Sequence, residues 1–95
     1  MDILANVTFL KIKNQDWNAV YKTGMRSNIS YGKENFCCLL AFNVDRAIGQ
    51  GETVECEISF LTHEPHTGKL YEGMPFKLFV GSLVFAEGSI SYVPE

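Results

Sequence analysis

The stretch Thr53-Val54-Glu55-Cys56-Glu57-Ile58-Ser59-Phe60 decides the fold. Apolar and polar residues alternate through it without a fault, which is the period of a β-strand with one buried face. A helix would scatter Glu55 and Glu57 around its circumference, whereas a strand places both on its solvent side. The pattern therefore predicts a strand with Val54, Cys56, Ile58 and Phe60 facing the core.

The same period of two extends through most of the chain. Ile3 to Leu10 alternates in the same way, and short strands are predicted at 18–22 and 28–31. The apolar run Phe36 to Phe42 suits a strand covered on both faces.

The second half is punctuated by turns and closes with a hairpin. Residues 48–52 form a predicted turn and 63–69 a loop, and 76–80 with 82–92 form a predicted hairpin or strand pair. Gly81 is placed at its turn, and Gly88 marks a bulge or a close backbone approach. Six or seven short strands without an amphipathic helix predict a single all-β domain over residues 1–95, a barrel or a sandwich.

The composition of the chain argues against several classes of function. The formal net charge is −3, with 46% hydrophobic and 20% charged residues, and no apolar run is long enough for a membrane helix. No signal-peptide pattern follows Met1, so we expect a cytoplasmic protein. The lack of a membrane-spanning run and the negative net charge lead us to expect neither membrane nor DNA binding. No phosphate-binding glycine motif is present, so we expect no nucleotide and no cofactor.

The cysteines and histidines offer the raw material for chemistry. Cys37, Cys38 and Cys56 are expected to be reduced thiols that behave as small apolar residues. His63, Glu64 and His66, with Cys56 as a fourth ligand, define a zinc-site alternative, but Pro65 places the histidines in a loop. We expect a solvated loop there, no metal and no enzyme activity.

Charge is distributed unevenly along the chain. Residues 1–48 contain six basic and four acidic residues, and residues 49–95 contain two basic and seven acidic ones. Glu55 and Glu57, outward neighbours on one strand, are candidates for an acidic patch that binds a basic partner. Trp17, in a polar loop, is either a lid on the barrel or an exposed partner anchor.

Several segments resemble, in order, those of a known family. Ala5 to Leu10 resembles its first strand, and Tyr21 to Arg26 resembles F-x-x-G-Y-R, with Arg26 on the matching position. Weaker matches follow at Gly49–Glu52 with Val54–Leu61, His63 with Pro65, Glu72–Leu78 and Ala86–Ile90. The chain thus resembles the C-terminal domain of elongation factor Tu, a translational GTPase. The resemblance implies a six-stranded β-barrel rich in antiparallel pairing.

The departures from that family bear on function. Its G-G-R-H-T-P-F loop, which helps hold the T-stem of aminoacyl-tRNA, corresponds here to Asn14–Val20, without arginine or histidine. Pro75 replaces another arginine, and Val80–Leu83 replaces the family's R-E-G-G-R turn. These 95 residues contain no GTPase domain, so the resemblance implies the fold and not GTP hydrolysis.

Two function classes remain beside the metal-site alternative. The first is a non-catalytic module that binds a protein partner, as an immunity protein neutralises a basic toxin, with contacts at Trp17, Arg26, Glu55 and Glu57. A partner within the translation machinery is the other version of this class. The second class is a tRNA-binding accessory protein that uses the basic residues of the first half, Lys11, Lys13, Lys22, Arg26 and Lys33.

Overall fold

The computed structural model describes residues 3–11, 20–31, 34–61 and 70–93, within which there are eight strands and no helix. The strands are β1 (Ile3–Phe9), β2 (Val20–Tyr21), β3 (Met25–Tyr31), β4 (Glu34–Phe42), β5 (Ile48–Gly49), β6 (Thr53–Phe60), β7 (Pro75–Val80) and β8 (Leu83–Tyr92). Within these residues, no helix has the length and apolar character needed to cross a membrane.

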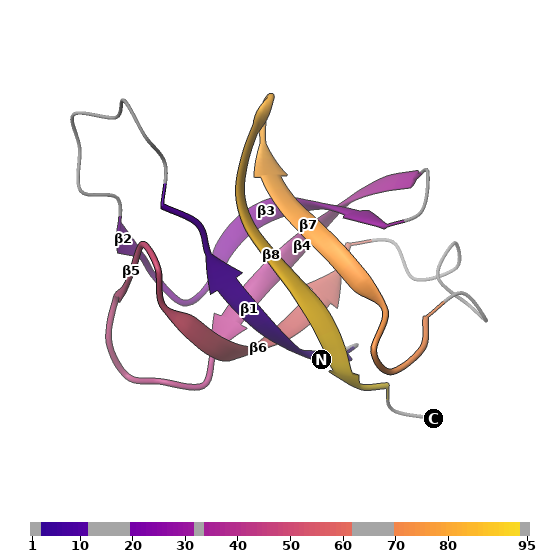
Figure 1. Cartoon of the computed structure of the whole chain (residues 1–95), viewed down its shortest axis with the longest axis horizontal. Coiled ribbons are helices and arrows are strands. Elements are labelled where there is room, and N and C mark those ends of the chain that lie inside the picture. Colours follow the sequence, from indigo (N-terminus) through magenta and orange to yellow (C-terminus); the bar gives the residue numbers. More distant parts are fainter. Residues whose placement is uncertain (1–2, 12–19, 32–33, 62–69, 94–95) are drawn as a thin grey trace.

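Six of the strands form a closed barrel in the order β1-β6-β4-β3-β7-β8, and β8 pairs back onto β1 (Figure 1). Every pairing in this barrel is antiparallel. The expected all-β, six-stranded antiparallel barrel is therefore confirmed. A closed barrel leaves no free sheet edge around its wall, which is how a small β-domain avoids edge-to-edge aggregation.

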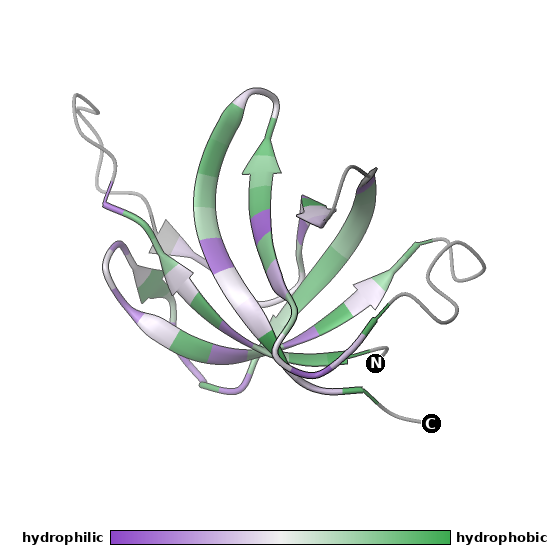
Figure 2. Ribbon diagram, turned by 45° about the vertical axis from the view of Figure 1, so that its right-hand side comes forward, coloured by the Kyte–Doolittle hydropathy of each residue, from purple (hydrophilic) through white to green (hydrophobic). Residues whose placement is uncertain are grey.

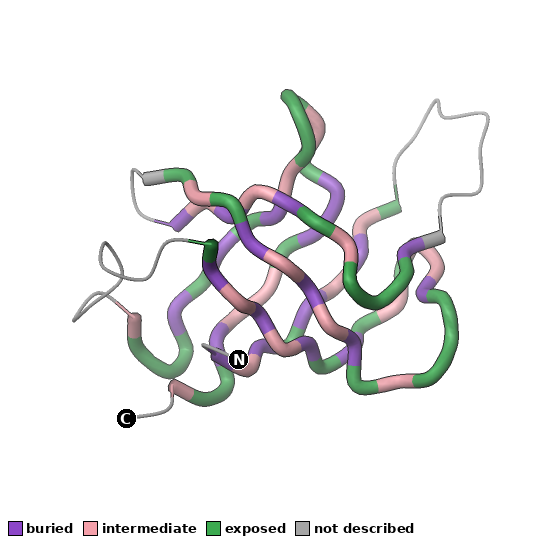
Figure 3. The backbone as a smooth tube through the Cα atoms, turned by 180° about the vertical axis from the view of Figure 1, so that it is seen from behind, coloured by how far each residue is buried: buried purple, intermediate pink, exposed green. Residues whose placement is uncertain are grey.

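The predicted alternation of buried and outward residues is confirmed for β6 and β1. Val54, Cys56, Ile58 and Phe60 are buried, while Glu55 is exposed and Glu57 and Ser59 are half-buried on the outer side. β1 alternates in the same way, and Figure 3 shows this change of burial along the strands. Because side chains fill the barrel interior, the surfaces open to a partner lie on its outside.

One expectation for β4 is wrong. Its apolar run was expected to be covered on both faces, but Cys37 is exposed and Leu39 and Ala41 are only half-buried. The barrel has a single interior, which takes Cys38, Leu40 and Phe42, and so the alternate residues face outward. The strand also begins two residues earlier than predicted, at Glu34.

An aromatic cluster closes one end of the core. The Phe9 ring is fully buried, stacks on Tyr21 with 4.6 Å between ring centroids, and meets the edge of Phe42 at 5.5 Å. Phe85 stacks on Tyr21 at 5.2 Å. Tyr21 belongs to the small β2–β5 sheet, which therefore adds part of the core at this end. Burial raises the pKa of Tyr21.

The β7–β8 hairpin extends beyond the rest of the barrel (Figure 1). Its turn contains Gly81, as predicted. The φ of Gly81 is +61°, a left-handed conformation that favours glycine. Gly88 lies farther along β8, opposite Val7 on β1 and Phe76 on β7. The close backbone approach expected at Gly88 is confirmed, whereas the register shifts lie at Leu4/Ala5 and Leu78/Phe79.

Candidate functional site

Glu55 and Glu57 point outward from β6 as predicted. Glu55 lies opposite Asn6 on β1, and its Oε1 accepts a 2.5 Å hydrogen bond from Nδ2 of Asn43. Glu57 lies opposite Leu4 on the same strand. The amide of Asn43 orients the Glu55 carboxylate but carries no charge, so the negative charge of Glu55 remains available to a partner.

The barrel brings a third carboxylate to the other side of β1. β1 lies between β6 and β8, and exposed Glu87 on β8 lies opposite Thr8. The outward residues of β1 itself, Leu4, Asn6 and Thr8, are uncharged. We call Glu55, Glu57 and Glu87 the acidic face. Sequence reasoning missed Glu87 because nothing in the sequence places β8 beside β1.

The remaining predicted site residues do not join this face. Arg26 is exposed on β3 and lies opposite Leu39, so β4 separates it from β6. Trp17 lies outside the described residues, as do Lys13, Lys33, His63, Glu64 and His66. The structure therefore brings two of the four predicted contact residues together, Glu55 and Glu57.

The thiols are free in the structure. Cys37, Cys38 and Cys56 form no disulfide, and Cys37 and Cys38 point to opposite sides of β4 as predicted. Cys56 is fully buried in the barrel, and burial raises its pKa to about 12. Its side chain lies among the core residues inside the barrel and not on the outer surface. Among the described residues no group of three or more His, Cys, Asp or Glu side chains could hold a metal ion.

An open hollow of about 700 Å³ adjoins the acidic face. Six polar residues from four neighbouring strands line it: Asn6, Thr8, Ser30, Lys77, Glu87 and Ser89. They form cross-strand rows, because Thr8 lies opposite Glu87, Glu87 opposite Lys77, and Lys77 opposite Ser30. Figure 2 shows hydrophilic residues at mid-length of β7 and β8, and hydrophobic ones toward the tip of the hairpin.

The tip of the β7–β8 hairpin is also exposed, but it is apolar where the acidic face is charged. Val80 is 54% exposed and Val84 is 38% exposed. These two apolar side chains belong to a pair of strands that continue past the barrel wall. The tip offers an apolar contact surface that contains neither acidic nor basic side chains.

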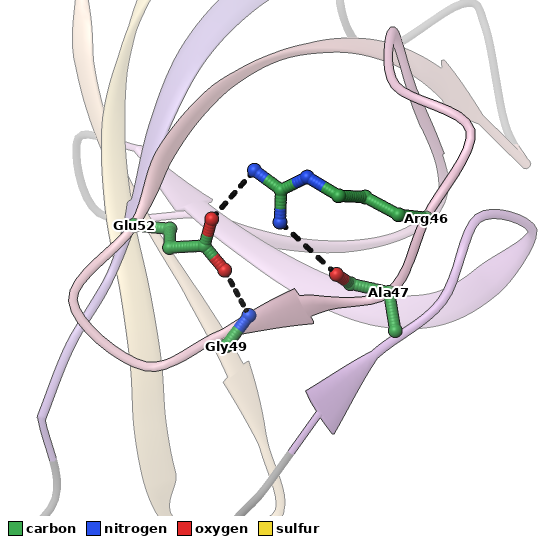
Figure 4. Close-up of polar contacts among 4 residues, drawn as sticks. All are labelled: Arg46, Ala47, Gly49 and Glu52. Carbon is green, nitrogen blue, oxygen red and sulfur yellow. Dashed lines mark hydrogen bonds and ion pairs between the residues drawn. The ribbon is translucent and has the colours of Figure 1, made fainter.

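A polar cluster orders the connection between β4 and β6 (Figure 4). Nη2 of Arg46 lies 2.6 Å from Oε1 of Glu52, and the backbone N–H of Gly49 donates a 2.6 Å hydrogen bond to Oε2. Nη1 of Arg46 donates to the carbonyl oxygen of Ala47 at 3.2 Å. The turn is joined to the barrel by two backbone bonds, from Phe9 N to Glu52 O and from Gly51 N to Phe9 O.

We expect this cluster to make the stability of the fold depend on pH. The hydrogen bond from Arg46, and then that from Gly49, hold the pKa of Glu52 below its ordinary value. A lowered carboxyl pKa stabilises the fold above the unfolded-state value, and this stabilisation is lost as pH falls through the folded-state value. We expect Glu52→Gln to lower Tm by about 1–3 °C at pH 7, because exposed ion pairs contribute little. The difference should shrink below about pH 4.

The measurement is thermal unfolding of both proteins, followed by circular dichroism between pH 7 and pH 3. Glu72→Gln is the control, since Glu72 is exposed and has no ion pair within the described chain. A Tm difference for E52Q that stays constant down to pH 3 would contradict the assigned role of Glu52.

Comparison with known proteins finds neither a family model that matches the chain nor a curated protein that does. The barrel agrees with the fold that the elongation factor resemblance implies, but a small β-barrel by itself does not identify that family.

Proposed function

We propose that the chain is a non-catalytic module that binds a basic surface of a protein partner through the acidic face. The supporting observation is the placement of Glu55 and Glu57 on β6 and of Glu87 on β8, on either side of a β1 whose outer residues are uncharged. Clustered like charge on a surface raises the rate of encounter with an oppositely charged partner and disfavours acidic ones. A neutralising protein of the immunity type acts in this way.

The position of the acidic face supports an external binding mode. The three carboxylates lie on β6 and β8, and both strands are hydrogen-bonded to β1 between them. They are therefore held on a rigid wall, so a partner would meet them without a large ordering cost. The resemblance to elongation factor Tu is consistent with this mode, because a barrel of that factor is part of a macromolecular assembly. Under the present proposal the chain keeps that scaffold and has a different contact surface.

The test is capture from an extract of the native organism, with three forms of the protein on the resin. These are the wild type, the double charge reversal Glu55→Lys/Glu57→Lys, and Glu72→Lys as a control reversal on an exposed turn. We expect one basic polypeptide to be retained by the wild type and by E72K. Its affinity for E55K/E57K should be lower by at least about tenfold at low salt.

Both proteins and RNA in the eluate are identified. Equal retention of the same polypeptide by all three forms would refute the acidic face as the contact surface. Recovery of tRNA, with binding that falls steeply as salt rises, would instead favour the RNA-binding alternative. Circular dichroism of each variant confirms that its barrel is folded.

A further inference from the structure

We infer that the hollow beside the acidic face receives an arginine side chain of the protein partner. The inference rests on the proposed function and names the chemical group that the partner would insert. The hollow has a volume of about 700 Å³, within the range of about 300–1,000 Å³ typical of ligand sites. Four of its six polar lining residues lie on β1 and β8.

Three acceptor groups converge there. Glu87 and Ser89 are two residues apart on β8 and share its outward side, and Asn6 lies directly opposite Ser89 on β1. Neighbouring side chains of this kind are about 5–7 Å apart. Within the described chain, no side-chain hydrogen bond or ion pair engages Glu87, Ser89 or Asn6. A carboxylate, a hydroxyl and an amide oxygen are thus available together.

A guanidinium group matches this set of acceptors better than an ammonium group does. It presents five N–H donors in a planar fork, so it can bind the Glu87 carboxylate and still donate to Ser89 or Asn6. Its aliphatic stem needs apolar surface, and Pro75, Phe76 and Tyr31 also line the hollow. An ammonium group is compact, and it would bind the carboxylate with fewer additional hydrogen bonds.

Lys77 provides a second test of this inference, because its charge acts on an incoming cation in the opposite sense to that of Glu87. It lies opposite Glu87 on β7 and lines the same hollow, and within the described residues the two form no ion pair. Its positive charge therefore opposes an incoming cation and lowers the affinity of the hollow. Removing the charge of Lys77 should strengthen arginine binding, whereas removing the charge of Glu87 should weaken it.

The probe is N-acetyl-glycyl-arginyl-glycine amide, titrated into the ¹⁵N-labelled protein and followed by NMR. We expect saturable shifts of the backbone amides near Asn6, Glu87 and Ser89. Glu87→Gln should raise Kd at least about fivefold, and Lys77→Gln should lower it about twofold. Glu72→Gln is the control and should leave Kd unchanged. The citrulline peptide, which has the same shape without the charge, should not bind, and the lysine peptide should bind more weakly.

Shifts that do not saturate, that centre elsewhere, or that appear equally with the citrulline peptide would overturn the inference. So would an unchanged Kd in both E87Q and K77Q. Failure here is distinct from failure of the proposed function. If E55K/E57K still lowers the affinity for the captured partner, the acidic face remains the contact surface and only the arginine assignment is wrong.

Discussion

Replacing Gly88 with alanine is expected to destabilise the barrel by about 2–3 kcal/mol. A Cβ atom at this position would overlap the backbone carbonyl oxygen of Asn6. It would also lie 2.9 Å from Cζ of Phe76 and 3.2 Å from Cα of Val7. Two of the three neighbours are backbone atoms of β1, so relief requires β8 to move away from β1 and weakens the closure of the barrel.

Urea unfolding followed by circular dichroism measures this effect. Gly49→Ala is the matched control, because the nearest atom to a Cβ there is Oε2 of Glu52 at 3.4 Å. G49A should change the free energy of unfolding by less than about 1 kcal/mol. If G88A were as stable as the wild type, the close approach of β1 and β8 at this point would be wrong.

Truncating Phe9 to alanine is expected to cost about 3–5 kcal/mol, the largest single loss that we predict. The ring is fully buried and contacts three other rings, those of Tyr21, Phe42 and Phe85. Its removal leaves a cavity where β1, the β2–β5 sheet and the hairpin meet. A domain of this size has about 5–15 kcal/mol of total stability, so F9A should be near the limit of folding.

The same urea measurement tests this prediction, with Phe36→Ala as the control. Phe36 is half-buried and stacks on Tyr31 at 5.4 Å, so its truncation should cost about 1–2 kcal/mol. The phenylalanine-to-leucine variant F9L keeps most of the volume and remains measurable if F9A does not fold. Equal losses for F9A and F36A would contradict the tighter packing assigned to Phe9 in the aromatic cluster.

The local pattern predicts the strands, because the period of two depends on residues a few positions apart. β6 and β1 follow their alternation residue by residue. Gly81 lies in a turn and Gly88 at a close backbone approach, as their positions in the sequence predict. β4 shows the limit of this reasoning. A continuous apolar run does not tell whether a second layer covers the outer face, and so Cys37 and Leu39 were misplaced.

The site depends on pairings between distant segments, which no local pattern encodes. Glu87 is 30 residues or more from Glu55 and Glu57 in the sequence, and it reaches the same surface only because β1 lies between β6 and β8. Lys77 faces Glu87 for a similar reason, through the register of the hairpin. The outward direction of Glu55 could be predicted, whereas the residues that lie near it on other strands could not.

Cross-saturation NMR on the complex with the captured partner tests the central claim most directly. It reports which backbone amides of the barrel lie against the partner. We expect the affected amides to lie on β6, β1 and β8, around Glu55, Asn6 and Glu87. An interface confined to the hairpin tip at Val80 and Val84, or to the connection around Arg46, would contradict it.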